Sequence, residues 1–172
     1  AREAGLESID DPNAYYTELE KHGSGAEDAD HGTVGAVALD LDGGLAAATS
    51  TGGIFNKKPG RVGDTPLIGV GTWADDQVAL SCTGHGEPFI RSCAAYDVAA
   101  QMRYGDVPMD AAAQATLTKV LALGGDGGLI AIDRTGQIIM PYNSQGLKRA
   151  AEGSHQDAVV RVFEPEPKGI SR

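Results

Sequence analysis

The stretch that decides the fold is DHGTVGAVALDLD, residues 30–42, where the character of the sequence changes. An acidic, polar segment ends at Gly32, and a run of small and apolar residues begins at once with Thr33. The alternation of small and apolar residues over 33–41 predicts a buried β-strand. Threonine is β-branched and suits a strand. The alternative is chemical: the bond between Gly32 and Thr33 is cut, and Thr33 becomes an N-terminal nucleophile.

The composition limits the class of protein. The chain has 172 residues, 41% of them hydrophobic, which is enough for one domain with a core of small aliphatic side chains. A formal net charge of −10 disfavours nucleic acid and anionic membranes as partners, because both attract basic surfaces. No apolar run approaches the ~20 residues of a membrane span, and no signal peptide is evident. We therefore expect a cytoplasmic protein, with Cys82 and Cys93 as reduced core thiols.

Working outward from residues 30–42, the sequence predicts strands, then two helices, then strands. A hairpin turn is indicated by Asp42-Gly43-Gly44. The other predicted strands are residues 45–51, 67–73, 77–83, 129–132, 137–142 and 159–163. This order differs from an alternating βαβ pattern and favours an α+β fold, in which helices cover antiparallel sheet.

The two predicted helices lie between residues 83 and 129. The first begins at Glu87-Pro88 and ends near Gly105. Its buried face is predicted to carry Phe89, Cys93, Tyr96 and Ala100. The second helix follows Pro108 and runs to about residue 123.

Candidate functional residues stand beside glycines at the predicted strand ends. In GRVGD, Arg61 could bind a carboxylate with two hydrogen bonds, and Asp64 could bind an ammonium group, as in recognition of a free amino acid. In CTGHGE, Thr83 offers a hydroxyl beside backbone N–H groups, the components of an oxyanion hole. Thr51 precedes two glycines in TSTGG. Each fragment alone is weak evidence, since strand threonines are usually structural and Arg–Asp pairs usually lie at the surface.

Together, the runs HGTVGAVALDLDGGLAAATSTGG, NKKPGRVGDTPLIGVG and SCTGHGEPFIR resemble the plant-type L-asparaginase / isoaspartyl peptidase family, over residues 33–149. These are N-terminal-nucleophile hydrolases. The resemblance implies a four-layer αββα sandwich, of which this chain would supply roughly half. It also implies hydrolysis of β-aspartyl dipeptides and of L-asparagine.

The resemblance assigns the catalytic roles by position. The chain would cleave itself between Gly32 and Thr33, and Thr33 would then be both nucleophile and, through its amino group, base. Thr51 would hydrogen-bond the nucleophile. Thr83 and Gly84 would form the oxyanion hole.

The resemblance also assigns substrate binding. Arg61 would hold the α-carboxylate and Asp64 the α-amino group, with further contacts from the backbones of Gly84 and Gly86. No metal or cofactor is expected in this chain, and a structural sodium is expected only in the remainder of the α subunit. The predicted partners are a small-molecule substrate and that subunit, in an (αβ)₂ assembly.

The same comparison divides the chain into residues 1–32, the tail of α with a linker, and residues 33–172, the β subunit. Three alternatives stay open: a glycosylasparaginase-like amidase, a non-catalytic truncated relative, and an amino-acid-binding module. Four further polar residues are expected to be incidental. They are His31 in the linker, His85 as a pocket wall, and Lys57 and Lys58 on a solvated loop. The run GGDGG, residues 124–128, is expected to be a helix-to-strand turn.

Overall fold

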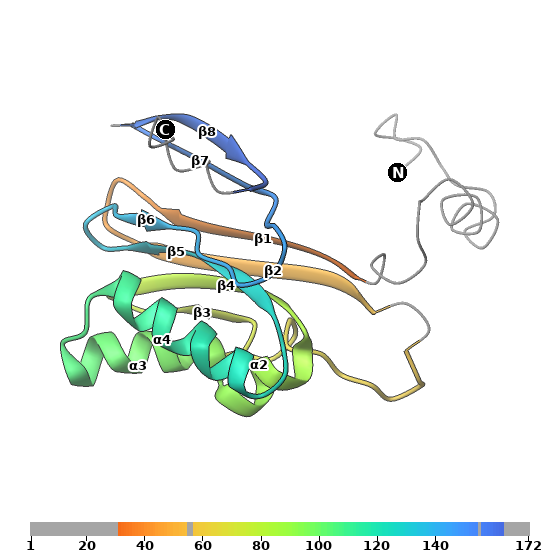
Figure 1. The fold of residues 1–172 in the computed structure, drawn as a ribbon. Coiled ribbons are helices and arrows are strands. Elements are labelled where there is room, and N and C mark those ends of the chain that lie inside the picture. The colour runs from red at the N-terminus through yellow and green to blue at the C-terminus, as the bar shows by residue number, and fades with distance from the viewer. Residues whose placement is uncertain (1–30, 55–56, 155, 164–172) are drawn as a thin grey trace, which may run out of the picture. The chain divides into compact units, whose positions relative to one another are not determined.

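The computed structural model describes residues 31–54, 57–154 and 156–163. The chain divides into two units, residues 1–31 and 32–172, and the fold described below belongs to the second. The predicted tail and linker, residues 1–32, lie outside the described part except for their last two residues, so that division stays a prediction. Figure 1 shows the described elements in chain order.

The first two strands form the hairpin that the sequence predicts around the turn at Asp42-Gly43-Gly44. Strand β1 (His31–Leu39) pairs with β2 (Leu45–Ile54) in a two-stranded sheet. The turn is closed by Asp40, whose carboxylate accepts hydrogen bonds from the N–H groups of Asp42 at 2.9 Å and Gly44 at 2.6 Å. Gly43 has φ +84°, the left-handed conformation that this turn needs from a glycine. Inward residues of β2 alternate with exposed ones, as in a strand with one covered face.

A four-stranded sheet in the order β3-β4-β5-β6 lies against this hairpin. Its strands are β3 (Thr72–Ala74), β4 (Val78–Gly84), β5 (Gly127–Asp133) and β6 (Ile138–Ile139), and each neighbouring pair is antiparallel. Thr49 of β2 joins the two sheets, because its hydroxyl lies 2.7 Å from that of Ser81 and donates to the Gly71 carbonyl at 3.1 Å. A Cβ atom at Gly35 would collide with Ser81, so glycine is needed where β1 crosses β4.

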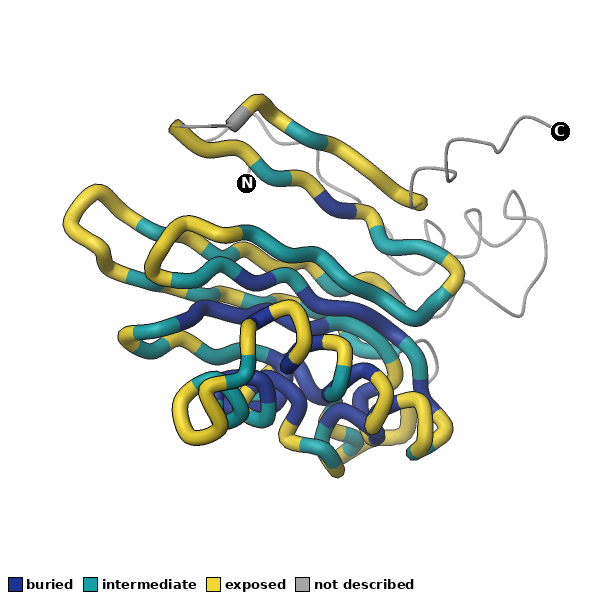
Figure 2. The backbone as a smooth tube through the Cα atoms, turned by 60° about the vertical axis from the view of Figure 1, so that its left-hand side comes forward, coloured by how far each residue is buried: buried dark blue, intermediate teal, exposed yellow. Residues whose placement is uncertain are grey.

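Three helices cover one face of the four-stranded sheet (Figure 1). They are α2 (Gly86–Ser92), α3 (Ala94–Gly105) and α4 (Met109–Ala122). The core between helices and sheet contains Phe89, Leu80, Leu117 and Leu129, all at most 2% exposed. Figure 2 shows buried backbone concentrated in β4, β5 and the helices. The mixed, layered architecture agrees with the predicted α+β class.

A last hairpin, β7 (Arg149–Gly153) with β8 (Gln156–Arg161), forms its own two-stranded sheet. Arg149 is the buried residue of β7, and it donates hydrogen bonds to the carbonyls of Leu147 at 3.0 Å and Val162 at 3.1 Å. Its guanidinium also lies over the ring of Tyr142, 4.7 Å from the centroid. The sequence predicted a strand at 159–163 but missed β7.

Two other predictions are wrong. Residues 67–71 form turns, with hydrogen bonds from Leu67 N to Asp64 O and from Val70 N to Leu67 O, and the strand begins only at Thr72. The helix predicted from Glu87 to Gly105 is two helices, because Cys93 adopts a left-handed conformation with φ 48°.

This break turns the buried face of the second helix. Ala94, Ala95, Val98 and Ala99 are buried, and Cys93 and Tyr96 are exposed. Cys82 is a buried thiol as predicted, and Cys93 is not. Among the described residues, no helix is long and apolar enough to cross a membrane.

Candidate active site

Thr33 and Thr51 meet across the β1–β2 hairpin. The Thr33 hydroxyl lies 3.4 Å from that of Thr51. The Thr51 hydroxyl in turn donates to the carbonyl oxygen of Gly32 at 2.8 Å, the carbonyl that precedes Thr33. One hydroxyl therefore contacts both the candidate nucleophile and the candidate scissile carbonyl.

The end of β2 holds Thr51 in this position. Gly53 has φ +81°, and its N–H donates to the Thr51 hydroxyl oxygen at 2.9 Å. Because the Thr51 oxygen accepts this bond, its own proton can be donated to the Gly32 carbonyl. Lys57 fixes the same turn, because its ammonium donates to the Gly52 carbonyl at 2.6 Å. Lys57 was expected to be only a solvated loop residue, and its hydrogen bond to the strand end is an addition to that prediction.

Arg61 is held by a residue that the sequence analysis did not place in the site. Its Nε donates to Glu87 Oε1 at 2.9 Å, and its Nη2 donates to Glu87 Oε2 at 3.3 Å. The arginine side chain is 16% exposed and the glutamate 58% exposed. The hydrogen bond from Arg61 lowers the pKa of Glu87, so the glutamate is ionised and the pair is charged near neutral pH. Within the described part of the chain, Nη1 has no hydrogen-bond acceptor.

Asp64 is buried, with 6% of its surface exposed. Burial raises the pKa of its carboxyl group, against the lowering effect of hydrogen bonds from its own N–H and that of Thr65. Within the described part of the chain, Oδ2 of Asp64 is buried without a hydrogen-bond partner. A buried carboxylate oxygen without a partner is costly. A bound ammonium group would satisfy it.

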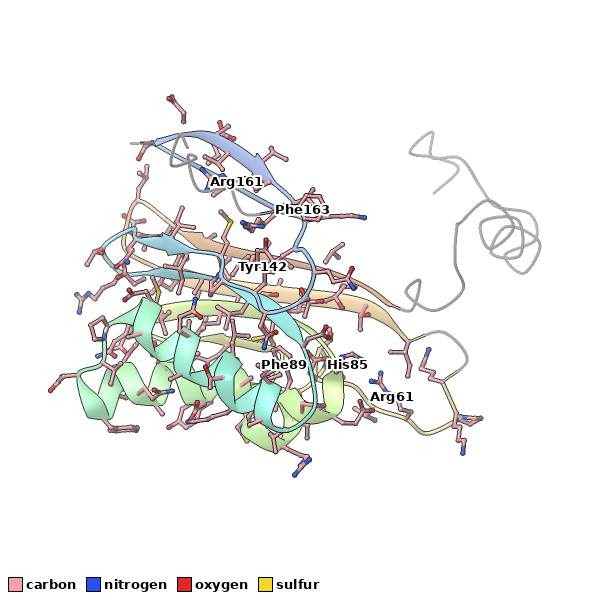
Figure 3. All side chains as sticks on the ribbon, in the orientation of Figure 1. Arg61, His85, Phe89, Tyr142, Arg161 and Phe163 are labelled. Carbon is pink, nitrogen blue, oxygen red and sulfur yellow. The ribbon has the colours of Figure 1, made fainter. Side chains whose placement is uncertain are left out.

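Gly86 packs between Arg61 and Asp64. A Cβ atom built on Gly86 would lie 3.0 Å from Arg61 Nη2 and 3.0 Å from the Asp64 nitrogen. The backbone at Gly86 therefore closes against both residues, and a side chain there would displace them. Figure 3 shows Arg61 and His85, the neighbour of Gly86, at the same end of the fold. The structure thus brings together three of the four residues expected to bind the amino-acid end of a substrate, Arg61, Asp64 and Gly86.

Thr83 and Gly84 end strand β4 beside this cluster. Gly84 has φ +147° and pairs with Gly127 of β5. Along β4 the N–H of Cys82 donates to Gly71 on one side, and that of His85 donates to Asp126 on the other. Because N–H groups alternate sides along a strand, the Gly84 N–H points to the Gly71 side, away from β5.

Gly71 links the two halves of the candidate site. Its carbonyl accepts the hydroxyl proton of Thr49, which lies two residues before Thr51 on the same face of β2. A Cβ atom at Gly71 would come within 2.6 Å of the backbone of Asp64. The threonine pair and the Arg61–Asp64 cluster therefore flank one closely packed backbone segment. Among the described residues, no group of three or more His, Cys, Asp or Glu side chains could hold a metal ion.

His85 was expected to be a pocket wall, and it has a specific partner. Its Nδ1 lies 2.7 Å from Oδ1 of Asp126, in the glycine-rich turn before β5. Neither Glu87 nor Asp126 was predicted to act in the site. Glu87 had a recognised position at a helix start, and nothing in the sequence indicated that it faces Arg61, 26 residues earlier.

Comparison with known proteins gives a consistent set of relatives. The family model described as asparaginase matches residues 4–162. The chain is 53% identical over 152 residues to the isoaspartyl peptidase of Escherichia coli, covering 87% of this chain and 44% of that protein. It is 44% identical over 132 residues to a probable isoaspartyl peptidase/L-asparaginase of Arabidopsis thaliana, covering 77% of this chain and 40% of that protein.

A mammalian relative is likewise matched by most of this chain over about half of its own length. The chain is 40% identical over 152 residues to the isoaspartyl peptidase/L-asparaginase of Macaca fascicularis, covering 86% of this chain and 49% of that protein. The chain therefore spans less than half the length of these curated relatives.

Proposed function

Because the chain belongs to the asparaginase family, we propose that it carries the catalytic threonine of a hydrolase for β-aspartyl dipeptides and L-asparagine. The observation that carries the proposal is the contact of the Thr51 hydroxyl with both Thr33 and the carbonyl of Gly32. A structural threonine pair needs no contact with the carbonyl of the preceding peptide bond. The relatives are isoaspartyl peptidases and L-asparaginases, which favours this activity over that of a glycosylasparaginase.

The first proposed step is self-cleavage. The hydroxyl oxygen of Thr33 attacks the carbonyl carbon of Gly32, whose oxygen accepts the hydrogen bond from Thr51. This bond stabilises the negative charge that develops on the carbonyl oxygen. The proton of the Thr33 hydroxyl passes to the amide nitrogen as the C–N bond breaks. The product is an ester and a free amino group, and water hydrolyses the ester to a Gly32 carboxylate and a free Thr33 hydroxyl.

Substrate turnover follows the same chemistry. The amino group of Thr33, with a typical pKa of about 7.7–8.0, is partly neutral at pH 7 and takes the hydroxyl proton. The oxygen attacks the side-chain carbonyl of asparagine or the isopeptide carbonyl of a β-aspartyl dipeptide. Ammonia or the second amino acid leaves with the proton, and water hydrolyses the β-aspartyl ester. Thr83 and the N–H of Gly84 would stabilise the oxyanion in both halves of this reaction.

The α end of the substrate would be bound by the Arg61–Asp64 cluster. The Nη1 group of Arg61 would donate to the α-carboxylate, since Nε and Nη2 donate to Glu87. Oδ2 of Asp64, buried and without a described partner, would bind the α-ammonium group. The close packing of Gly86 against both residues supports a shared binding site.

Two exposed apolar surfaces support the proposal that the fold is completed by an α subunit. The outer face of β1 exposes Val34, Ala36 and Ala38, with Val34 72% exposed. A groove of about 820 Å³ between β1, β5, β6 and β7 is lined by a set of apolar side chains, with Asp40, Thr135, Glu152 and Ser154 also in its lining. The apolar side chains include Val37, Leu39, Ile130, Ile132, Ile138 and Met140. Sheet faces of this kind are usually covered.

On this basis we infer a four-layer αββα sandwich in an (αβ)₂ assembly. A structural sodium in the α part, outside this chain, and a cytoplasmic location belong to the same proposal. The alternative of a non-catalytic relative would need the same covering layers, so self-cleavage and activity are the properties that separate the two.

The test is intact-mass analysis of the natural gene product during several days of incubation, followed by assay with asparagine and with a β-aspartyl dipeptide. We expect a fragment that begins at Thr33, and ammonia or amino-acid release that appears with it. Thr33→Ala should remain uncut and inactive, while Thr118→Ala, an exposed helix threonine, should behave as wild type. A fully active Thr33→Ala protein would exclude Thr33 as the nucleophile. A wild-type chain that stays whole would favour the non-catalytic relative.

A further inference from the structure

The pair formed by His85 and Asp126 has no part in the chemistry proposed above. His85 directly follows the Gly84 oxyanion position, and Asp126 lies in the turn between α4 and β5. The distance from His85 Nδ1 to Asp126 Oδ1 is 2.7 Å. Because a carboxylate only accepts hydrogen bonds, the short contact assigns the proton to Nδ1, and the longer approach of the Asp126 N–H to the same nitrogen, at 3.5 Å, is then not a hydrogen bond. The side chains are 55% and 45% exposed, so the pair adds little to folding stability.

The backbone around this pair is packed closely against Gly84. The N–H of His85 donates to the Asp126 carbonyl at 3.0 Å. A Cβ atom at Gly84 would collide with that carbonyl oxygen and come within 2.7 Å of Gly127 Cα. A Cβ atom at Gly125 would lie 3.3 Å from the Cβ of His85. The turn before β5 therefore packs against two consecutive residues, Gly84 and His85.

This contact fixes the direction of the Gly84 N–H. The His85 N–H is occupied by Asp126, on the β5 side of β4. The neighbouring N–H of Gly84 must then point to the opposite side, where the candidate site lies. Glycine at 84 gives its own backbone little stiffness, so the orientation of this donor depends on what holds His85. Two contacts hold it: the backbone bond to the Asp126 carbonyl at 3.0 Å and the side-chain contact of His85 Nδ1 with Asp126 Oδ1 at 2.7 Å.

We propose that Asp126, acting through His85, is a positioning residue that orients the Gly84 N–H for oxyanion stabilisation. The inference rests on the proposed function, because it assumes that Gly84 contributes to the oxyanion hole. Neither side chain would touch the substrate. The glycines around Asp126 allow its turn to approach the end of β4, which gives the GGDGG run a role beyond that of a connection.

The test is a double-mutant cycle with His85→Ala and Asp126→Ala in the full-length, self-cleaved protein, assayed with a β-aspartyl dipeptide. Each single variant should lower kcat about tenfold, with KM within about twofold, since a misaligned oxyanion donor mainly affects the transition state. The double variant should be no worse than either single one, because the pair acts as a unit. His85→Asn, whose amide can still donate to Asp126, should recover part of the loss.

The controls separate this inference from the proposed function. Asp133→Asn removes a carboxylate from the turn at the other end of β5 and should leave kcat unchanged. All variants should cleave themselves at the wild-type rate, because in self-cleavage the hydroxyl of Thr51 contacts the Gly32 carbonyl. Unchanged kcat in the single variants, losses that multiply in the double variant, or failure of self-cleavage would each overturn the positioning role. An inactive wild-type protein would instead overturn the proposed function itself.

Discussion

Arg61 and Glu87 form a two-point ion pair, with Nε–Oε1 at 2.9 Å and Nη2–Oε2 at 3.3 Å, beside the buried carboxylate of Asp64. The pair matters because Arg61 is the proposed carboxylate ligand. Glu87 accepts hydrogen bonds from Nε and Nη2, so among the described residues Nη1 is the nitrogen without a hydrogen-bond acceptor. It also stands at the first turn of α2, so the helix fixes the guanidinium from outside the binding site.

Glu87→Gln should therefore weaken substrate binding without touching the chemistry. Loss of the charged pair frees the Arg61 side chain, and an exposed pair of this kind is worth at most about 1 kcal/mol. We expect KM for asparagine to rise about fivefold, with kcat within twofold. Steady-state kinetics at low salt would measure both, with Glu152→Gln on β7 as the matched charge control. A KM equal to that of wild type would show that Arg61 does not depend on Glu87.

Asp64→Asn should weaken substrate binding and raise stability together. Burial raises the pKa of Asp64, so ionisation of this carboxyl costs folding free energy. That cost is absent below the ordinary aspartate pKa, and it is fully present only above the raised folded-state pKa. Removing it should stabilise the fold by about 1 kcal/mol, or roughly 2–4 °C in Tm. Asp110→Asn, an exposed helix-start carboxylate, is the control for both thermal unfolding and kinetics.

The pH dependence of Asp64 gives a separate prediction. The ionised carboxylate would bind the α-ammonium group, so kcat/KM for asparagine should fall as the pH drops through its pKa in the free enzyme. Because that pKa is raised, the fall should begin at a higher pH than an ordinary aspartate would give. In Asp64→Asn the residual kcat/KM should lack this acidic limb. Persistence of the limb in the variant would assign it to another group.

Thr51→Ala should slow self-cleavage. The variant loses the hydroxyl that donates to the Gly32 carbonyl at 2.8 Å, and one lost oxyanion donor typically costs about 10²–10³ in rate. Thr51→Ser keeps the hydroxyl and should cleave within about tenfold of wild type. A time course of fragment appearance after purification measures the rates. Equal cleavage in the alanine and serine variants would remove Thr51 from this step.

Local patterns predicted the elements that local forces decide. The β1–β2 hairpin follows from alternation and from a turn that Asp40 and Gly43 close within five residues. The α4 helix follows from Pro108 and an uninterrupted run of helix-forming residues. In both cases the stabilising contacts lie close in the sequence, and pattern reasoning detects them.

The errors came where tertiary contacts override the pattern. The apolar run at residues 67–71 resembles a strand, but Gly69 adopts φ +84° and the segment turns against Asp64. The left-handed break at Cys93 has no glycine to signal it. Glu87 lies 26 residues from its partner Arg61. Neither the hydrophobic periodicity of the sequence nor a short motif can predict a contact between two charged residues that far apart. The residues of the candidate site were predicted by the resemblance, and their mutual contacts came only from the structure.

The last prediction concerns stability away from the site. Asp97 of α3 joins the helices, because its carboxylate accepts hydrogen bonds from Thr116 at 2.6 Å, Gln101 at 2.9 Å and Lys119 at 2.7 Å. Thr116 is fully buried, so Asp97→Ala would leave its hydroxyl with fewer partners, at a cost of about 1–3 kcal/mol. Denaturant unfolding should detect that loss while kcat and KM of the folded protein stay unchanged.

Lys119→Gln separates the two kinds of contact that Asp97 makes. The lysine is 52% exposed, so removing its charge should cost less than about 1 kcal/mol. The loss in Asp97→Ala should be clearly larger, because it also removes the acceptor for the buried hydroxyl. If the two variants lost the same stability, the exposed ion pair would account for the whole effect, and the buried bond to Thr116 would contribute nothing to the packing of α3 on α4.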